Sequence, residues 1–212
     1  MNSNSTRAAG FALLVGSIGF LITMGFHPTS GSLEGLVREA AVRVGTHSLG
    51  IASAVLSFCG FVGLYQRVRA EPVFAPAALI VHGFASVAAI CAAVVNGLAA
   101  PAYAARMIGE PALHETARAV LSYSLLLNAG FARVFMVGVA MALLLWAVAI
   151  RRTRALPDWL AWLGAVLGIA GLAAVLGGFL GVGVREFGLF VLGYAAWTIA
   201  VGSILLRSPA RP

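Results

Sequence analysis

The chain has 212 residues, of which 61% are hydrophobic and 10% are charged, whereas about 25% of the residues in soluble domains are charged. Its fourteen basic residues, all Arg, and seven acidic residues give a net charge of +7. A soluble domain of this size would need more charged residues on its surface. The composition therefore predicts a single integral membrane domain over residues 1–212. The Arg residues flank apolar segments and form no basic domain, so we expect no binding of nucleic acid.

Six apolar segments have about the length needed to cross a bilayer. A hydrocarbon core of about 30 Å requires roughly 20 residues of helix. The predicted spans are residues 8–26, 47–65, 76–98, 131–150, 157–182 and 187–206. The expected fold is therefore all-α, a polytopic bundle of six transmembrane helices in contact with the lipid bilayer.

The distribution of charge orients the predicted bundle. The side that would hold both termini carries eight Arg and two acidic residues, and the opposite side carries six Arg and five acidic residues. Arg151, Arg152 and Arg154 lie directly at the end of a span. Because short cytoplasmic loops are enriched in Arg and Lys, we expect both termini in the cytoplasm. The use of Arg alone is typical of GC-rich bacterial genomes, which favours a multi-pass protein of a bacterial inner membrane.

The first outer connection contains a predicted amphipathic helix. Apolar residues recur at helical spacing from Leu33 to Val44, and Ser32 is a suitable N-cap. Glu39 precedes Arg43 by four residues, which favours an ion pair on one helix face. We expect this helix to lie at the outer membrane interface or to fold over the bundle as a lid.

The second outer connection leads into the fourth span. Pro111 suits the first turn of a helix, and no helix breaker follows it before Arg152, so one long helix from residue 111 inward is compatible with the sequence. A polar face on its outer half indicates contact with water, protein or a ligand. The candidate ligand-binding residues on this face are Glu115, Arg118, Asn128 and Arg133. Arg133 lies about two residues inside the apolar segment, where a charge is costly, so it either extends outward to water, pairs with a Glu or binds an anionic ligand. If the outer side holds a functional site, Arg118 and Arg133 are its anion-binding groups.

Three histidines belong to the same outer side: His27, His47 and His114. Imidazoles together with nearby Glu carboxylates suit Zn, Cu or Fe, so these histidines are the candidate metal ligands. Two imidazoles at matching depth would also suit haem. No HxxH, HExxH or CxxC motif supports either group, so the sequence favours no particular cofactor.

The fifth span is rich in glycine. It contains Gly164-x-x-x-Gly168 and Gly177-x-x-x-Gly181, and small residues at this spacing allow two helices to approach closely in lipid. Two hypotheses follow from this pattern. The glycines pack against other helices of the same bundle, or they form the interface of a homodimer.

The passage Arg151-Arg-Thr-Arg-Ala-Leu-Pro-Asp-Trp-Leu-Ala-Trp-Leu-Gly, with the glycine-rich helix after it, resembles a feature of small bacterial inner-membrane proteins. These proteins belong to domain-of-unknown-function families in which helix four ends in basic residues and helix five opens with a Leu-Pro-x-Trp-like turn. The resemblance covers helices four and five only. It implies a six-span bundle, and it carries no activity and no functional residues.

Three classes of function remain open. We favour a non-enzymatic membrane protein that binds a lipid or a small apolar or anionic ligand, or that serves as an accessory subunit of a membrane partner. The alternative is a metal- or haem-dependent redox protein or enzyme with an outward-facing His/Glu/Arg site. A second alternative is a small-solute exporter or channel. No acidic residue is expected at the bilayer midplane, which disfavours an ion-coupled transporter.

Overall fold

The computed structural model describes residues 3–207, and every regular element within this range is a helix. The long elements are α1 (Ser3–Gly25), α3 (Ala40–Val68), α4 (Phe74–Ala93), α6 (His114–Thr153), α7 (Asp158–Leu176) and α8 (Val184–Arg207). The short elements are α2 (Leu33–Arg38), the π-helical turn η1 (Val94–Ala99), α5 (Ala100–Met107) and the 3₁₀ turn η2 (Pro111–Leu113).

Six helical segments in the described range are long and apolar enough to cross a membrane. They run from Asn4 to Gly25, Ala40 to Val68, Phe74 to Met107, Pro111 to Thr153, Asp158 to Leu176 and Val184 to Arg207. The predicted all-α fold and a multi-pass membrane protein are thereby confirmed.

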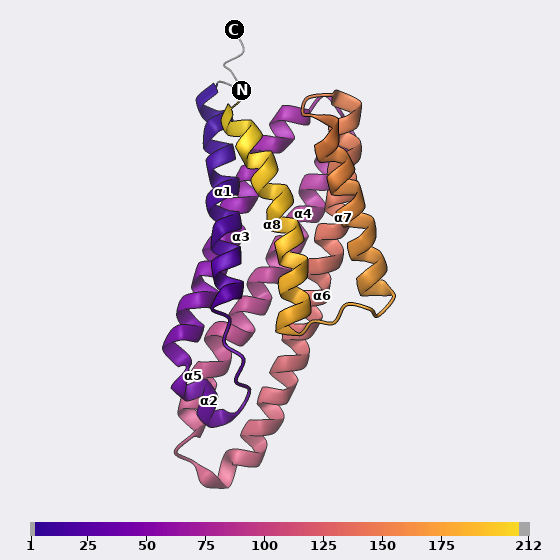
Figure 1. Ribbon diagram of the computed structural model, residues 1–212. Helices are drawn as coiled ribbons and strands as arrows, with labels where there is room; N and C mark the ends of the chain where they lie inside the picture. Colours follow the sequence, from indigo (N-terminus) through magenta and orange to yellow (C-terminus); the bar gives the residue numbers. More distant parts are fainter. Residues whose placement is uncertain (1–2, 208–212) are drawn as a thin grey trace.

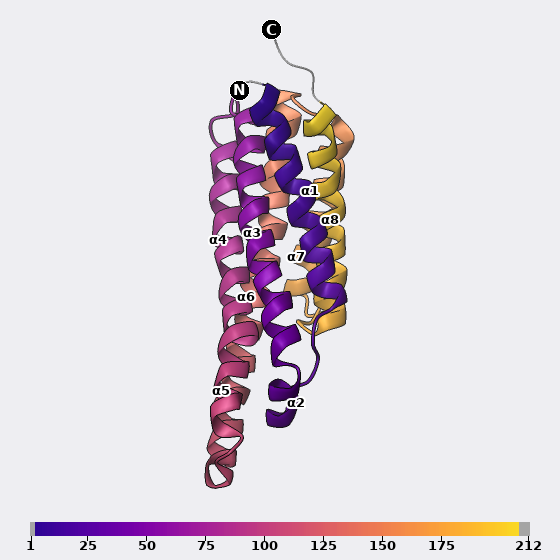
Figure 2. The ribbon, with the colours of Figure 1, turned by 90° about the vertical axis from the view of Figure 1, so that its left-hand side faces the viewer.

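The described ends of the chain, the start of α1 and the end of α8, lie at the same end of the bundle (Figure 1). The opposite end, called the α2 end below, carries α2, α5 and the connection between α5 and α6. Figure 2 shows α5 and the facing part of α6 extending well past α1 and α8. With 40 residues, α6 is about 60 Å long, twice the thickness of a hydrocarbon core. The sequence left open whether one helix runs inward from residue 111; in the structure the 3₁₀ turn η2 occupies Pro111–Leu113, and α6 is continuous from His114 to Thr153.

Two helix ends differ from the predicted spans for identifiable reasons. The helix α3 begins at Ala40 and not near residue 47, because Arg43 and His47 are buried in the bundle and have partners there. The fifth span ends at Leu176 and not near residue 182. Gly177 and Gly178 follow it, and Gly178 has a φ of 74°, a left-handed conformation that glycine adopts without strain.

The predicted outer amphipathic helix is shorter than expected. Its N-cap is confirmed, since the backbone N–H of Gly35 donates to Ser32 Oγ at 3.0 Å. The helix ends at Arg38, and the rest of the apolar stripe belongs to α3. Leu33 and Leu36 are buried, and they pack in one cluster with Ala100, Ala104, Ala117 and Leu121 of α5 and α6. The apolar side of α2 thus contacts protein at the projecting end of the bundle.

The core of the bundle is aromatic at its centre and glycine-rich along α7. The ring of Phe61 stacks at 5.9 Å from Trp146 and at 6.2 Å from Trp197. The indole of Trp197 is fully buried and donates to the Leu160 carbonyl at 2.9 Å. A Cβ at Gly168 would lie 2.8 Å from the carbonyl oxygen of Ala140 on α6. Gly168 therefore packs within the bundle, the first of the two hypotheses for this span.

At the end of the bundle that holds both described chain ends, Glu71 ties α4 to α6. Its carboxylate accepts hydrogen bonds from the backbone N–H groups of Val73, Phe74 and Ala75, and it forms an ion pair with Arg152 at 3.3 Å. Burial acts to raise the pKa of Glu71, but these hydrogen bonds outweigh it and lower the pKa below its usual value. The contribution of this carboxylate to stability is therefore present near neutral pH and is lost only in acid.

Replacement of Gly168 by Ala is expected to destabilise the bundle by about 1–3 kcal/mol, because the added methyl group meets backbone that has little room to move. Gly130 on α6 is the matched control, since no atom lies within 4 Å of a Cβ placed there. Gly130→Ala should be neutral or slightly stabilising, because Ala favours helix. Thermal unfolding in detergent measures both variants, and equal midpoints would contradict close packing of α7 on α6.

Candidate functional site

A cavity of about 350 Å³ lies among the halves of α1, α3, α4, α6 and α8 that are nearer to the α2 end. Pockets that bind small molecules usually measure about 300–1,000 Å³, so this cavity is at the small end of that range. The connection between α1 and α2, called the strap here (residues 26–32), and the start of α8 complete its wall.

The lining of the cavity changes from polar to apolar with depth. Most of the polar side chains lie nearer the α2 end, where Leu125 and Val184 also line the cavity, and the side chains deeper in the bundle are mainly apolar. The polar residues are His27, Arg43, His47, Asn96 and Asn128, and the deep apolar residues include Phe20, Ala89, Phe135 and Val191. Thr23 also lines the cavity, but its hydroxyl donates to the carbonyl of Gly19 at 2.9 Å in the same helix.

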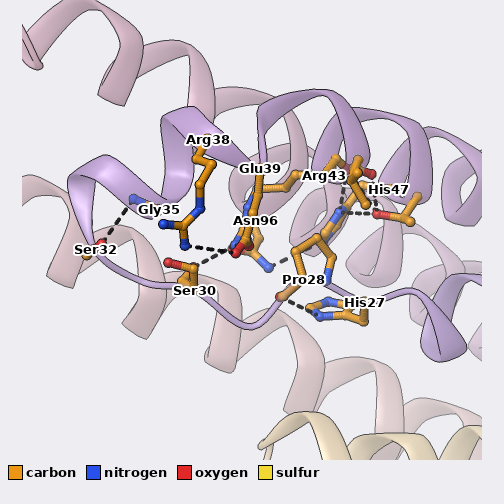
Figure 3. A network of polar contacts seen from close by, with 12 residues as sticks. His27, Pro28, Ser30, Ser32, Gly35, Arg38, Glu39, Arg43, His47 and Asn96 are labelled. Carbon is orange, nitrogen blue, oxygen red and sulfur yellow. Dashed lines mark hydrogen bonds and ion pairs between the residues drawn. The ribbon is translucent and has the colours of Figure 1, made fainter.

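Arg43, in the second turn of α3, is the centre of the polar end. Its side chain is only 2% exposed. Its Nη1 donates to Asn96 Oδ1 at 3.2 Å, and its Nη2 donates to the Ser30 carbonyl of the strap at 2.6 Å (Figure 3). The carboxylate of Glu39 lies 3.7 Å away, which confirms the predicted pairing of these two residues. Arg43 thus joins α3, the strap and η1.

The hydrogen bonds of His47 define its tautomer. Its Nδ1 lies 2.8 Å from the Arg43 carbonyl oxygen, which only accepts, so Nδ1 carries the proton. The side-chain amide of Asn96 donates to Nε2 at 3.3 Å, since its oxygen already accepts from Arg43. This assignment follows from the hydrogen-bond network. His47 is therefore a neutral imidazole with both ring nitrogens engaged.

The π-helical turn η1 presents Asn96 to this network. A π-helical turn contains an extra residue, which changes the direction in which the following side chains point. Asn96 and Gly97 are both buried in this turn. A Cβ at Gly97 would overlap the side chain of His47, so only glycine allows α3 to come this close. The turn and the glycine together bring Asn96 to Arg43 and His47.

His27 lies beside His47, with 4.9 Å between the ring centroids. Its Nδ1 is 3.0 Å from the Pro28 carbonyl and donates to it, which leaves Nε2 as a free acceptor. Burial, followed by the neighbouring imidazole of His47, lowers the pKa of His27 to about 4. The ring is therefore neutral at pH 7.

The structure brings together some of the predicted site residues and separates the others. Asn128, His27 and His47 line the cavity. Glu115, Arg118 and Arg133 are exposed and lie outside its lining. Arg133 follows Asn128 by five residues, which turns it about 140° around α6. A single helix face therefore cannot present both residues to the cavity.

The third predicted metal ligand, His114, lies apart from the other two. Its Nε2 is 3.3 Å from the Ile108 carbonyl, and it does not line the cavity. Among the described residues, no three His, Cys, Asp or Glu side chains are grouped so that they could hold a metal ion. Of the predicted trio, the structure places only His27 and His47 together.

Sequence reasoning missed two residues of the site, Arg43 and Asn96. The sequence pattern predicts Arg43 only as the partner of Glu39 on one helix face. Asn96 carried a usable signal, because a polar side chain inside a predicted span is rare unless it has a partner there. Comparisons of the chain with models of protein families, with characterised proteins and with solved structures find no match. The resemblance of the Arg151–Gly164 passage therefore stays a prediction.

Replacing Asn96 by Leu is expected to destabilise the protein by roughly 2–4 kcal/mol, because Arg43 and His47 would each lose a buried hydrogen-bond partner. Asn128→Leu is the matched control, since Asn128 lines the same cavity but forms no hydrogen bond with another described residue. The free energy of unfolding in detergent and denaturant measures both variants. A similar loss in the two variants would show that the hydrogen bonds of Asn96 do not stabilise the bundle.

Stability is expected to fall as the pH decreases from about 6.5 towards about 4. In this pH range His27 is protonated in the unfolded chain but stays neutral in the folded chain, because its pKa is lower in the folded chain. Protonation therefore stabilises the unfolded state. Thermal unfolding at about pH 7 and about pH 5 should show a smaller decrease for His27→Gln than for the original chain. Glu71 is present in both proteins, so its contribution does not change the difference between them. Equal decreases would contradict a buried neutral His27.

Proposed function

We infer that this protein is a non-enzymatic, multi-pass protein of a bacterial inner membrane that binds one amphipathic, lipid-like ligand in the cavity. The ligand head lies among the polar residues at the α2 end, and its apolar body reaches towards Phe135 and Phe20. The positive-inside distribution of Arg favours cytoplasmic termini, so the α2 end faces away from the cytoplasm.

The polarity gradient of the cavity is the observation that carries this proposal. In a lipid leaflet, head groups lie at the surface and chains point to the midplane. The cavity repeats this order, with His27, Arg43 and Asn128 towards the α2 end and Phe20 and Phe135 deeper. A lipid entering from the adjacent leaflet would keep its orientation and would exchange lipid neighbours for aromatic and aliphatic side chains.

The chemistry of the histidines favours binding over metal-dependent catalysis. His47 has both ring nitrogens engaged in hydrogen bonds, so it has no lone pair free for a metal. Within the pair, only Nε2 of His27 remains free as a donor atom for a metal. One imidazole nitrogen is a poor basis for a metal site, since such sites usually supply three or four protein ligands.

Filling the cavity tests the proposal. Ala129 lines it from α6, so Ala129→Phe should exclude the ligand. Ala119→Phe is the matched control, because Ala119 is exposed on the same helix and lies outside the cavity. Native mass spectrometry of protein extracted in native-lipid discs should show one retained amphiphile in the original chain and in Ala119→Phe, and none in Ala129→Phe. Equal retention in all three proteins, or none in the original chain, would refute the proposal.

A further inference from the structure

We propose that the ligand of this cavity has an anionic head group, a phosphate or a carboxylate, which Arg43 binds with assistance from Asn128. This inference rests on the proposed function and specifies its ligand. The positions of Arg43 and Asn128 indicate the charge of the head group and the end of the cavity at which it binds.

The charge of the cavity wall is the first argument. None of the described residues that line the cavity is acidic, and Arg43 is the member with a permanent charge. The Oε2 atom of Glu39 is buried 3.7 Å from Nη2 of Arg43 and lies outside the lining, so it offsets part of the charge of Arg43 without forming a hydrogen bond with it. The lining itself therefore favours an anion over a cation.

The unused donors of Arg43 are the second argument. A guanidinium group has five N–H bonds, and it cannot accept a hydrogen bond. Asn96 and Ser30 use two of these N–H bonds. The Nε atom is buried and has no hydrogen-bond partner among the described residues. A buried charged donor without a partner is unfavourable, so a phosphate or carboxylate oxygen is the complement that this side chain lacks.

The rigidity of the guanidinium group is the third argument. Its two hydrogen bonds hold it against both the strap and η1, and the Asn96 amide that orients it is itself bound to His47. A positioned group loses little conformational freedom when a ligand binds. Asn128 lines the same cavity from α6, and its amide has no hydrogen-bond partner among the described residues, so it can donate a further hydrogen bond.

Amphiphiles that share one chain and differ in the head group show how much the head group contributes to affinity. Oleyl phosphate, oleate, oleyl alcohol and oleylamine are titrated against the purified protein in non-ionic detergent, and bound fractions are read by native mass spectrometry. Oleyl phosphate and oleate should bind about tenfold or more tightly than the alcohol, as expected for a charge-assisted hydrogen bond, and oleylamine should bind most weakly. Equal affinities would overturn the anionic head group while leaving the binding of amphiphiles intact.

Two variants test whether Arg43 causes the preference for an anionic head group over a neutral one. Arg43→Gln should bind the phosphate and the alcohol with about equal affinity. Arg118→Gln, which removes an exposed Arg with the same change in net charge, should keep the full preference. Loss of the preference in Arg118→Gln would overturn the assignment, and so would its persistence in Arg43→Gln. If Arg43→Gln does not fold, the titrations of the original chain still decide whether the head group is anionic.

The source of the anion is decided by one added comparison. An oleoyl lysophosphatidylglycerol carries the phosphodiester of a membrane lipid, whereas oleate carries the carboxylate of a free fatty acid. Tighter binding of either compound relative to oleyl alcohol supports the anionic head group and identifies its source. Failure of every amphiphile to bind the original chain would refute the proposed function as well.

Discussion

The burial of one guanidinium group, that of Arg43, is the constraint on which this end of the molecule depends. A charge inside an apolar bundle is unfavourable by several kcal/mol unless hydrogen bonds replace the water that it loses. Its partners come from the strap through Ser30 and from η1 through Asn96. These contacts determine where the strap crosses the bundle, which way Asn96 points and which tautomer His47 adopts. Arg43 also lines the cavity, and its Nε has no hydrogen-bond partner among the described residues.

The lengths of the helices support this arrangement. The helix α6 is much longer than a membrane is thick, so the half of it nearer the α2 end stands beside α5 and provides a surface for α2. With α2 packed there, the strap between α1 and α2 is held at both ends. The cavity beneath it therefore has a polar end formed by α3, η1 and the strap, and deep walls formed by apolar residues of α1, α4, α6 and α8. The head group of an amphiphile would therefore contact the polar end of the cavity, and its chain would contact the apolar walls.

Much of the fold follows from local sequence, whereas most of the site does not. Hydrophobic length predicts the six spans, Pro111 and the absence of a later helix breaker predict the long α6, and Ser32 predicts the start of α2. The site depends on contacts between distant residues, since Arg43 meets Ser30 and Asn96, which are 13 and 53 positions away. The π-helical turn interrupts the regular period of α4, so helical spacing alone cannot place Asn96. Arg118 and Arg133 are predicted because a charge at the edge of an apolar segment needs water or a partner, and the structure leaves both exposed to meet that need, whereas Arg43 is the Arg that lines the cavity.

A cryo-electron microscopy map of the protein in native-lipid discs would test the central claim most directly. We predict continuous density for one elongated molecule in the cavity, with its head beside Arg43 and its chain extending towards Phe135. A cavity that contains only water, or an apolar chain beside Arg43 with no head group there, would contradict this interpretation.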